Sequence, residues 1–208
     1  MLEQEGYEQY LRLPHLLGSI APRTSPAEEE VYASEWLFIV VHQSAEIILS
    51  QILLDLHAVE RGHKEGWPDE KRMVRCLERA TSLVSLLGNH LDVLKRDLPV
   101  DHFTAFRHRL GEASGSQSSQ FSELFRLVGL GSDESSPLLA GADGNIEGSM
   151  VGAAAAALMS AVRAWQLQHI GLVQRMIGSS KGTGGTSGVS YLRARAVRLQ
   201  SSSEGRTL

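Results

Sequence analysis

Residues 73–98 carry a regular stripe of apolar side chains, and this stripe constrains the fold more than any other part of the sequence. Its members follow one another at alternating four- and three-residue steps: Met73, Leu77, Ala80, Val84, Leu87, Leu91, Leu94 and Leu98. That spacing places them on one face of a helix that packs nearly parallel to its neighbours. Pro68, Asp69 and Glu70 are typical of a first helical turn, and Pro99 marks the end. We therefore assign the stripe to the core of a helical bundle.

The rest of the chain also has helical spacing, whereas β-branched runs that alternate with polar residues do not occur. We expect a short helical or extended piece over 7–18 and helices over 34–59, 103–110, 118–128, 148–177 and 189–199. In the helix over 34–59, Ser34 is the expected N-cap, and apolar residues surround the axis, which predicts burial on most sides. The predicted fold is all-α, with a single helical domain over 1–208.

The connections between these helices are marked by small and polar residues. Residues 21–30 contain Pro and several Glu and predict a loop. Residues 132–148 are rich in Gly, Ser and Asp and predict a flexible connection. Gly178 is the expected C-terminal cap of the helix before it, and we expect the tail 200–208 to be frayed.

Composition and charge exclude several classes of function. The formal net charge is −4, and no cluster of Lys and Arg stands beside aromatic residues, so nucleic acid is not an expected partner. Polar and charged residues interrupt the most apolar stretch, 36–56, which therefore predicts a buried helix and no membrane span. The single cysteine, Cys76, and the absence of a signal-peptide pattern predict a cytoplasmic protein.

Two of the eight histidines stand out by their placement. His42 lies on the most apolar helix, with Phe38 one turn before it and Glu46 one turn after it, so the three side chains share a face. His169 follows Trp165 by one turn near the end of the helix over 148–177. Neutral imidazole is a common haem ligand, and a bundle core is a usual place for haem. From spacing alone, each is interpreted first as a histidine that is hydrogen-bonded to a carbonyl, with haem ligation as the alternative.

The other histidines give weaker indications of a binding site. His57, Glu60 and His63 lie at three-residue spacing, but Gly62 and Gly66 suggest that the helix is ending, so we do not expect a metal site there. The remaining histidines have no clustered carboxylate or cysteine and are interpreted as surface or structural residues: His15, His90, His102 and His108.

Two further features suggest binding of a carboxylate. The loop KGTGGTSG lacks the order of a phosphate-binding loop and follows a helix, yet its glycine amides and Thr183 would allow close approach of a carboxylate. Arg107 lies among aromatic residues, and a partly buried guanidinium usually holds a carboxylate. That carboxylate belongs either to a ligand or to an internal acid such as Glu112 or Glu123.

Four separated blocks, in this order, resemble the haem-dependent tryptophan 2,3-dioxygenase family: GYEQYLRLPHLL, SEWLFIVVHQSAEIIL, FTAFRHRLGEASGSQSSQF and QHIGLVQRMIGSSKGTGGTSGVSYLR. The first block is weak, but the other three are specific in combination. The resemblance implies haem b as cofactor and oxidation of the indole C2–C3 bond of L-tryptophan or a derivative by O2, which gives N-formylkynurenine.

The resemblance also implies roles around the iron and the indole. His169 is the implied proximal haem ligand, and His42 is the implied distal histidine beside the indole N–H and the catalytic residue. Phe38 and Phe103 are expected to wall the indole pocket.

At the other end of the substrate, Arg107 is the implied clamp of the carboxylate, and Thr183 with its loop is expected to hold the amino and carboxylate groups. Ser114 and Gly115 are expected to lie against the haem or the indole.

The family habit further implies a homo-oligomer, a tetramer or a dimer. In it the N-terminal segment reaches a neighbouring subunit's site, with Tyr7, Tyr10 and Leu11 as the residues expected to contribute.

The chain departs from the family pattern in three places. Ser116 stands where the family usually has Phe, Ile47 stands where Trp is usual, and the chain is short, mainly between 120 and 169. A reshaped pocket favours a second hypothesis: a monooxygenase of natural-product biosynthesis that makes an oxindole from a modified tryptophan such as β-methyltryptophan. A third, of another class, is a non-catalytic helical binding protein on the same scaffold.

Overall fold

The computed structural model describes residues 6–65, 69–130, 149–180, 182, 187–190, 192 and 193. Every regular element in these ranges is helical: α1 (Tyr7–Tyr10), α2 (Leu13–Gly18), α3 (Glu29–Glu65), α4 (Glu70–Asp97), α5 (Val100–Arg107), α6 (Ser119–Leu127), α7 (Met150–Ile177) and two 3-10 turns, His108–Leu110 and Gly115–Gln117. The predicted all-α class is confirmed.

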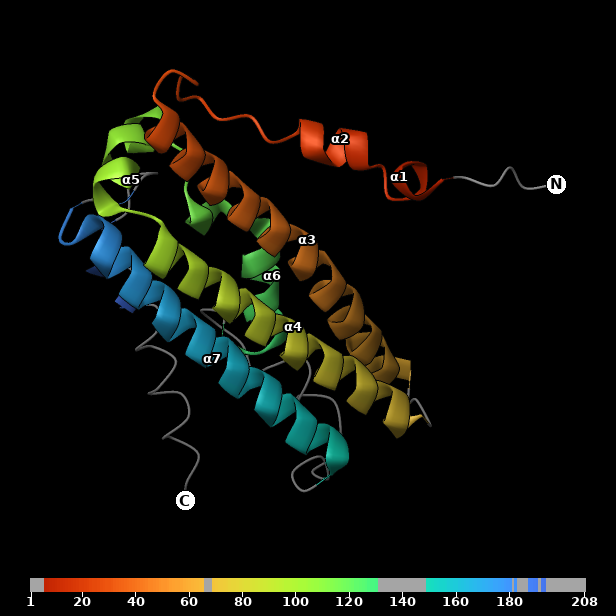
Figure 1. Cartoon of the computed structure of the whole chain (residues 1–208). Coiled ribbons are helices and arrows are strands. Elements are labelled where there is room, and N and C mark those ends of the chain that lie inside the picture. Colours follow the sequence, from red (N-terminus) through yellow and green to blue (C-terminus); the bar gives the residue numbers. More distant parts are fainter. Residues whose placement is uncertain are drawn as a thin grey trace.

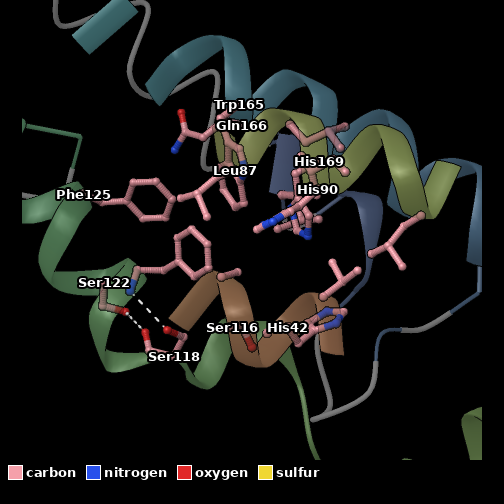
Figure 2. A pocket seen from close by; sticks show the side chains of 18 residues that line it. His42, Leu87, His90, Ser116, Ser118, Ser122, Phe125, Trp165, Gln166 and His169 are labelled. Atoms are coloured by element: carbon pink, nitrogen blue, oxygen red, sulfur yellow. Dashed lines mark hydrogen bonds between the residues drawn. The ribbon is translucent and has the colours of Figure 1, made fainter. Parts of the chain in front are cut away.

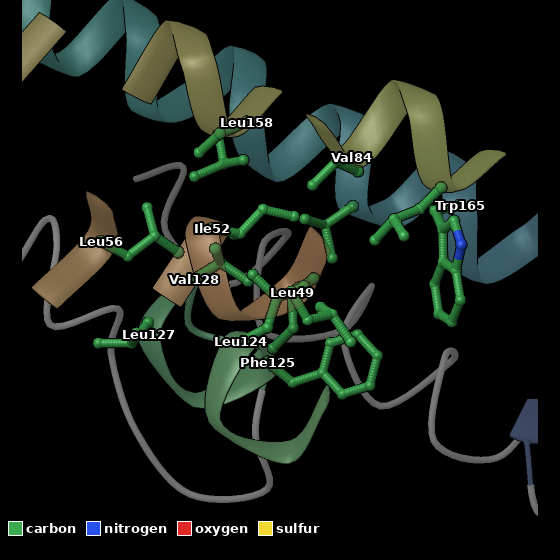
Figure 3. Packing of buried hydrophobic residues seen from close by; sticks show 14 of the residues in the cluster. Leu49, Ile52, Leu56, Val84, Leu124, Phe125, Leu127, Val128, Leu158 and Trp165 are labelled. Atoms are coloured by element: carbon green, nitrogen blue, oxygen red, sulfur yellow. The ribbon is translucent and has the colours of Figure 1, made fainter. Parts of the chain in front are cut away.

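Three long helices form the body of the molecule, and α4 packs against both α3 and α7 (Figure 1). Helices α5 and α6 pack against α3, while α1 and α2 lie beyond α3, on the side away from α7. Apolar side chains from α3, α4, α6 and α7 meet in one core (Figure 3). This packing fixes the relative positions of the histidines discussed below.

Helix α4 follows the sequence prediction closely. All eight residues of the apolar stripe are buried. Asp69 caps the N-terminus, where its carboxylate accepts a hydrogen bond from the backbone N–H of Arg72 at 3.0 Å. Pro68, which was expected to open this helix, lies outside the described residues.

Helix α3 corrects two expectations. It begins at Glu29 instead of Ser34, because Glu29 and Glu30 supply an acidic first turn that suits a helix N-terminus. Ser34 is therefore no N-cap; it is buried inside the helix, and its Oγ lies 2.9 Å from Nδ1 of His102 on α5. The loop expected over 21–30 is correspondingly shorter.

Burial of α3 on most sides was also wrong. Ile47 and Leu54 are 51% and 62% exposed, and Trp36 is 38% exposed. The reason is position: α3 lies at the edge of the bundle, with α4, α5 and α6 packed against it and an open outer side (Figure 1). By length and composition alone both α3 and α7 could cross a membrane, but a core helix passes the same test, so the test assigns no span.

The remaining helices begin and end mostly near their predicted positions. Helix α5 begins three residues before the expected Phe103. Ser118 caps α6 by accepting from the N–H of Phe121 at 3.1 Å. Gly178, with φ +55°, ends α7 as expected. The connection 132–148, the tail 200–208 and most of the helix expected over 189–199 lie outside the described residues.

Candidate functional site

A mostly apolar cavity of about 130 Å³ lies between α3, α4, α6 and α7 (Figure 2). Leucine, valine and aromatic side chains form most of its walls, and three histidines reach it from three different helices. Of the described residues that line the cavity, none is Lys or Arg. A ligand held there is therefore surrounded by hydrocarbon and by a few neutral polar groups.

His169 projects into this cavity from α7, and its ring is held by stacking. The ring lies parallel to that of Trp165, with centroids 5.1 Å apart and an interplanar angle of 6°, and Phe121 of α6 stacks on Trp165 at 4.5 Å. Burial, and secondarily the nearby His42, lower the pKa of His169 to about 4. The imidazole is thus neutral at pH 7, which is the form that binds a metal.

His42 lies on α3, on the wall opposite His169 (Figure 2). Its Nδ1 is 2.7 Å from the carbonyl oxygen of Phe38, so Nδ1 carries the proton and donates it. Burial lowers the pKa of His42, although Phe38 and Glu46 act in the opposite direction. Many protein atoms lie around the His42 ring. The residue nevertheless keeps accessible surface, because it lines both this cavity and a second, open hollow between α2 and α3. In the neutral ring Nε2 is consequently a bare acceptor.

The third histidine is His90 of α4, which sequence reasoning had interpreted as a surface or structural residue. A surface position was wrong: His90 is half-buried and lines the cavity, and its Nδ1 is buried without a hydrogen-bond partner among the described residues. Burial lowers its pKa. A usable signal was present, since His90 follows Leu87 by three residues and precedes Leu94 by four, which places it on the same face as the buried stripe.

Phe38 and Phe103 support the site without bordering the described cavity. The centroid of the Phe38 ring lies 4.0 Å from that of His42 and 5.9 Å from that of Phe103. Phe106, which is fully buried, contacts both phenylalanines at 5.6 and 5.4 Å. This cluster holds the helix turn that carries His42, and a direct role in walling an indole stays a prediction.

The residues expected to bind the amino and carboxylate groups of a substrate do not all line the described cavity. Arg107 ends α5, is half-buried and does not line the described cavity. Gly115 lines the cavity, whereas Ser114 does not; the Ser114 hydroxyl lies 2.9 Å from that of Ser116, which does line it. Thr183 lies outside the described residues.

Helix α1 lies beyond α3, apart from α4, α6 and α7 (Figure 1), and none of its residues lines the cavity. Tyr7, Tyr10 and Leu11 are 74%, 75% and 42% exposed. Helix α2 is linked to α3 by a hydrogen bond from Nε2 of Gln43 to the carbonyl oxygen of Ser19 at 3.1 Å. Action of this segment on a neighbouring subunit stays a prediction.

Two members of the weak metal triplet, His57 and Glu60, belong to an ion-pair network, whereas Nε2 of His63 is buried without a partner among the described residues. His57 lies 3.5 Å from Glu60 and 3.5 Å from Glu123, and Arg126 pairs with Glu123 at 2.7 Å. Within the described ranges, no group of three or more potential ligands is placed to hold a metal ion.

The described residues therefore define an all-α bundle in which two neutral histidines face each other across an apolar cavity. Residues 2–137 and 150–201 match the family described as Tryptophan 2,3-dioxygenase, which covers most of the chain. The chain belongs to this family of haem dioxygenases that act on tryptophan.

Relatives named tryptophan 2,3-dioxygenase are similar to this chain over most of its length. One from Nocardioides sp. is 30% identical over 248 aligned positions, which cover 92% of this chain and 89% of the relative. One from Bradyrhizobium sp. is 28% identical and covers 90% and 86%, and one from Pseudomonas fluorescens is 26% identical and covers 92% and 86%. These alignments exceed the 208 residues of this chain, so the relatives carry residues that it lacks.

Members of this family typically bind haem, and the cavity residues suit that group. His169 offers a neutral imidazole whose orientation is fixed by Trp165. The walls are mostly hydrocarbon, as a macrocycle requires. His169 is the residue that would hold the iron of such a group.

Proposed function

We propose that this protein is a haem-dependent oxygenase that uses O2 to oxidise the indole C2–C3 bond of L-tryptophan or a substituted tryptophan. The placement of His42 and His169 on facing walls of an apolar cavity carries the proposal. Bound haem b would supply the iron centre at which O2 is activated. The remaining contributions come from the chain itself.

His169 would hold the iron through its imidazole, and the stack on Trp165 prevents the ring from rotating. His42 would orient the substrate, because its Nδ1–H is committed to the Phe38 carbonyl and its bare Nε2 can accept the indole N–H. The apolar walls would exclude water from both groups. Together these residues would bind the cofactor, orient the substrate and exclude water from both. These are the usual contributions of a protein to reactions that a cofactor performs.

The cavity is too small for haem unless its walls move apart. About 130 Å³ is close to a cavity that takes one aromatic ring and below the roughly 300–1,000 Å³ usual for larger ligands. A haem with a substrate would therefore need the wall formed by α3 and α6 to move away from α4 and α7. Binding would then be accompanied by changed hydrogen exchange in α6, the shortest of these helices.

Ser116 favours the second candidate, a monooxygenase that makes an oxindole from a modified tryptophan. Its hydroxymethyl group lines the cavity at the place where the family usually has a phenyl ring, and the smaller side chain leaves room for a substituent. Catabolic-type and specialised oxygenation share the residues named above, so the product must distinguish them.

Turnover under ¹⁸O-labelled dioxygen tests the proposal. Haem-loaded protein is reduced with ascorbate and supplied with L-tryptophan or with β-methyltryptophan, and the mass of the product is measured by mass spectrometry. Ascorbate also supplies the two electrons that a monooxygenase needs to convert the second oxygen atom of O2 to water. Two labelled oxygens in the product establish dioxygenation, and one establishes the oxindole-forming reaction. No labelled product from either substrate would contradict both and favour a non-catalytic binding protein.

A matched pair of variants refines this test. His42→Ala should lose most of the turnover, because the indole N–H loses its acceptor. His108→Ala, at an exposed histidine near the end of α5, should keep it. Equal activity of the two variants would refute the orienting role of His42.

We further propose that the chain forms a cytoplasmic homo-oligomer in which the exposed residues of α1 and its following turn contact a neighbouring copy. The open outer side of α3 supports this proposal. Sedimentation of the haem-loaded protein tests it, and a monomer at micromolar concentration would refute it.

A further inference from the structure

His90 lies in the cavity wall and has a ring nitrogen without a hydrogen-bond partner. It lines the cavity from α4, and its Nδ1 has no accessible surface and no partner among the described residues. Figure 2 places it on the same wall as His169 and opposite His42. Buried polar groups in folded proteins are almost always paired, so an unpaired Nδ1 is unusual, and Nε2 is the nitrogen of this ring that is left to contact a ligand.

The buried Nδ1 also decides which nitrogen of the neutral ring carries the proton. A buried N–H without an acceptor is rarer in folded proteins than an acceptor left bare. The proton therefore belongs on Nε2, the nitrogen that can reach the cavity. His42 has the opposite tautomer, since its Nδ1–H donates to the Phe38 carbonyl. His90 is thus a hydrogen-bond donor to the cavity, whereas His42 is an acceptor.

The position of His90 limits what it can contact. It shares a wall with His169, so a macrocycle held by His169 would separate it from an indole on the side of His42. With its proton on Nε2, the ring does not offer that nitrogen to iron. The hydrogen-bond acceptors that haem b would offer are its two carboxylates, and the described residues that line the cavity include no Lys or Arg to neutralise them.

We propose that Nε2–H of His90 donates a hydrogen bond to a haem carboxylate and retains the cofactor, an inference that rests on the proposed haem function. A hydrogen bond to a carboxylate is among the stronger ones in proteins. Its loss leaves the iron ligand in place and speeds departure of the cofactor.

The test measures the rate at which haem passes from the loaded protein to an excess of apomyoglobin. His90→Leu should lose haem at least about tenfold faster than the unaltered chain. His90→Gln keeps an N–H donor and should stay within about threefold of the unaltered chain. The Soret band of both variants should keep its position, because His169 still binds the iron.

Haem dimethyl ester, in which both carboxylates are methylated, distinguishes this role from a structural one. An ester is a weaker acceptor than a carboxylate, so His90→Leu should speed loss of the ester by less than about threefold. An equal acceleration for haem and its ester would overturn the proposal, as would an unchanged rate for haem in His90→Leu. A shifted Soret band would instead mark His90 as an iron ligand. If the unaltered chain binds no haem, the proposed function itself fails.

Discussion

The low pKa of His169 predicts that the haem-free chain loses stability in mild acid. The unfolded chain binds a proton at this residue near pH 6.5, whereas the folded chain does so near pH 4. Between these values the unfolded state holds more protons, so the free energy of unfolding falls as the pH falls below about 6.5. From this shift we expect a loss of about 1 kcal/mol between pH 7 and 5.5, and about 2 kcal/mol by pH 4.5.

Urea unfolding of the haem-free chain at pH 7, 5.5 and 4.5 measures this loss. His169→Gln removes the titrating group while keeping a polar side chain of similar size. Between pH 7 and 4.5, its free energy of unfolding should therefore fall by about 2 kcal/mol less than that of the unaltered chain. His15→Gln is the matched control, because His15 is exposed on α2, and it should follow the unaltered chain. An identical acid response of His169→Gln and the unaltered chain would refute the reasoning, because the imidazole would then not be held neutral by burial.

Three further predictions concern the frame around the site, each measured by urea unfolding at pH 7. Phe106→Ala removes a fully buried ring that contacts Phe38 and should cost about 3–5 kcal/mol; a cost below 1 kcal/mol would contradict its place in the core. Asp69→Ala removes the cap of α4 and should cost about 1 kcal/mol, whereas no change would mean that the cap is not formed in solution. Arg79→Met leaves the buried carboxylate of Asp55 without its 2.8 Å partner and should lower the free energy of unfolding; a stabilised variant would contradict the pairing.

Periodicity was sufficient to predict the helices because the core of this protein is built from continuous apolar stripes. The stripe of α4 gave the correct helix, the correct buried face and the correct C-terminal end. Periodicity failed for α3, where apolar residues occur on all sides although one side is open. A single chain's sequence does not distinguish an apolar face that is buried in its own core from one that is left at the edge of the bundle.

The site was predictable in part. His42 and His169 were selected from eight histidines by their neighbours and by the family resemblance, and the fold brings both to one cavity. His90 was missed because a lone histidine at the edge of a leucine stripe has no sequence partner, and its significance depends on the helix that packs opposite. Arg107 was expected at the ligand, yet it lies at the last position of α5 and does not line the described cavity.

Haem binding by His169 is the central claim, and visible spectroscopy of a cavity variant tests it most directly. The unaltered chain should bind one haem per chain with a Soret band characteristic of histidine ligation. His169→Gly should lose that band and regain it when free imidazole is added, because imidazole can occupy the space that the side chain leaves. A His169→Gly spectrum identical to that of the unaltered chain, with no response to imidazole, would contradict the assignment.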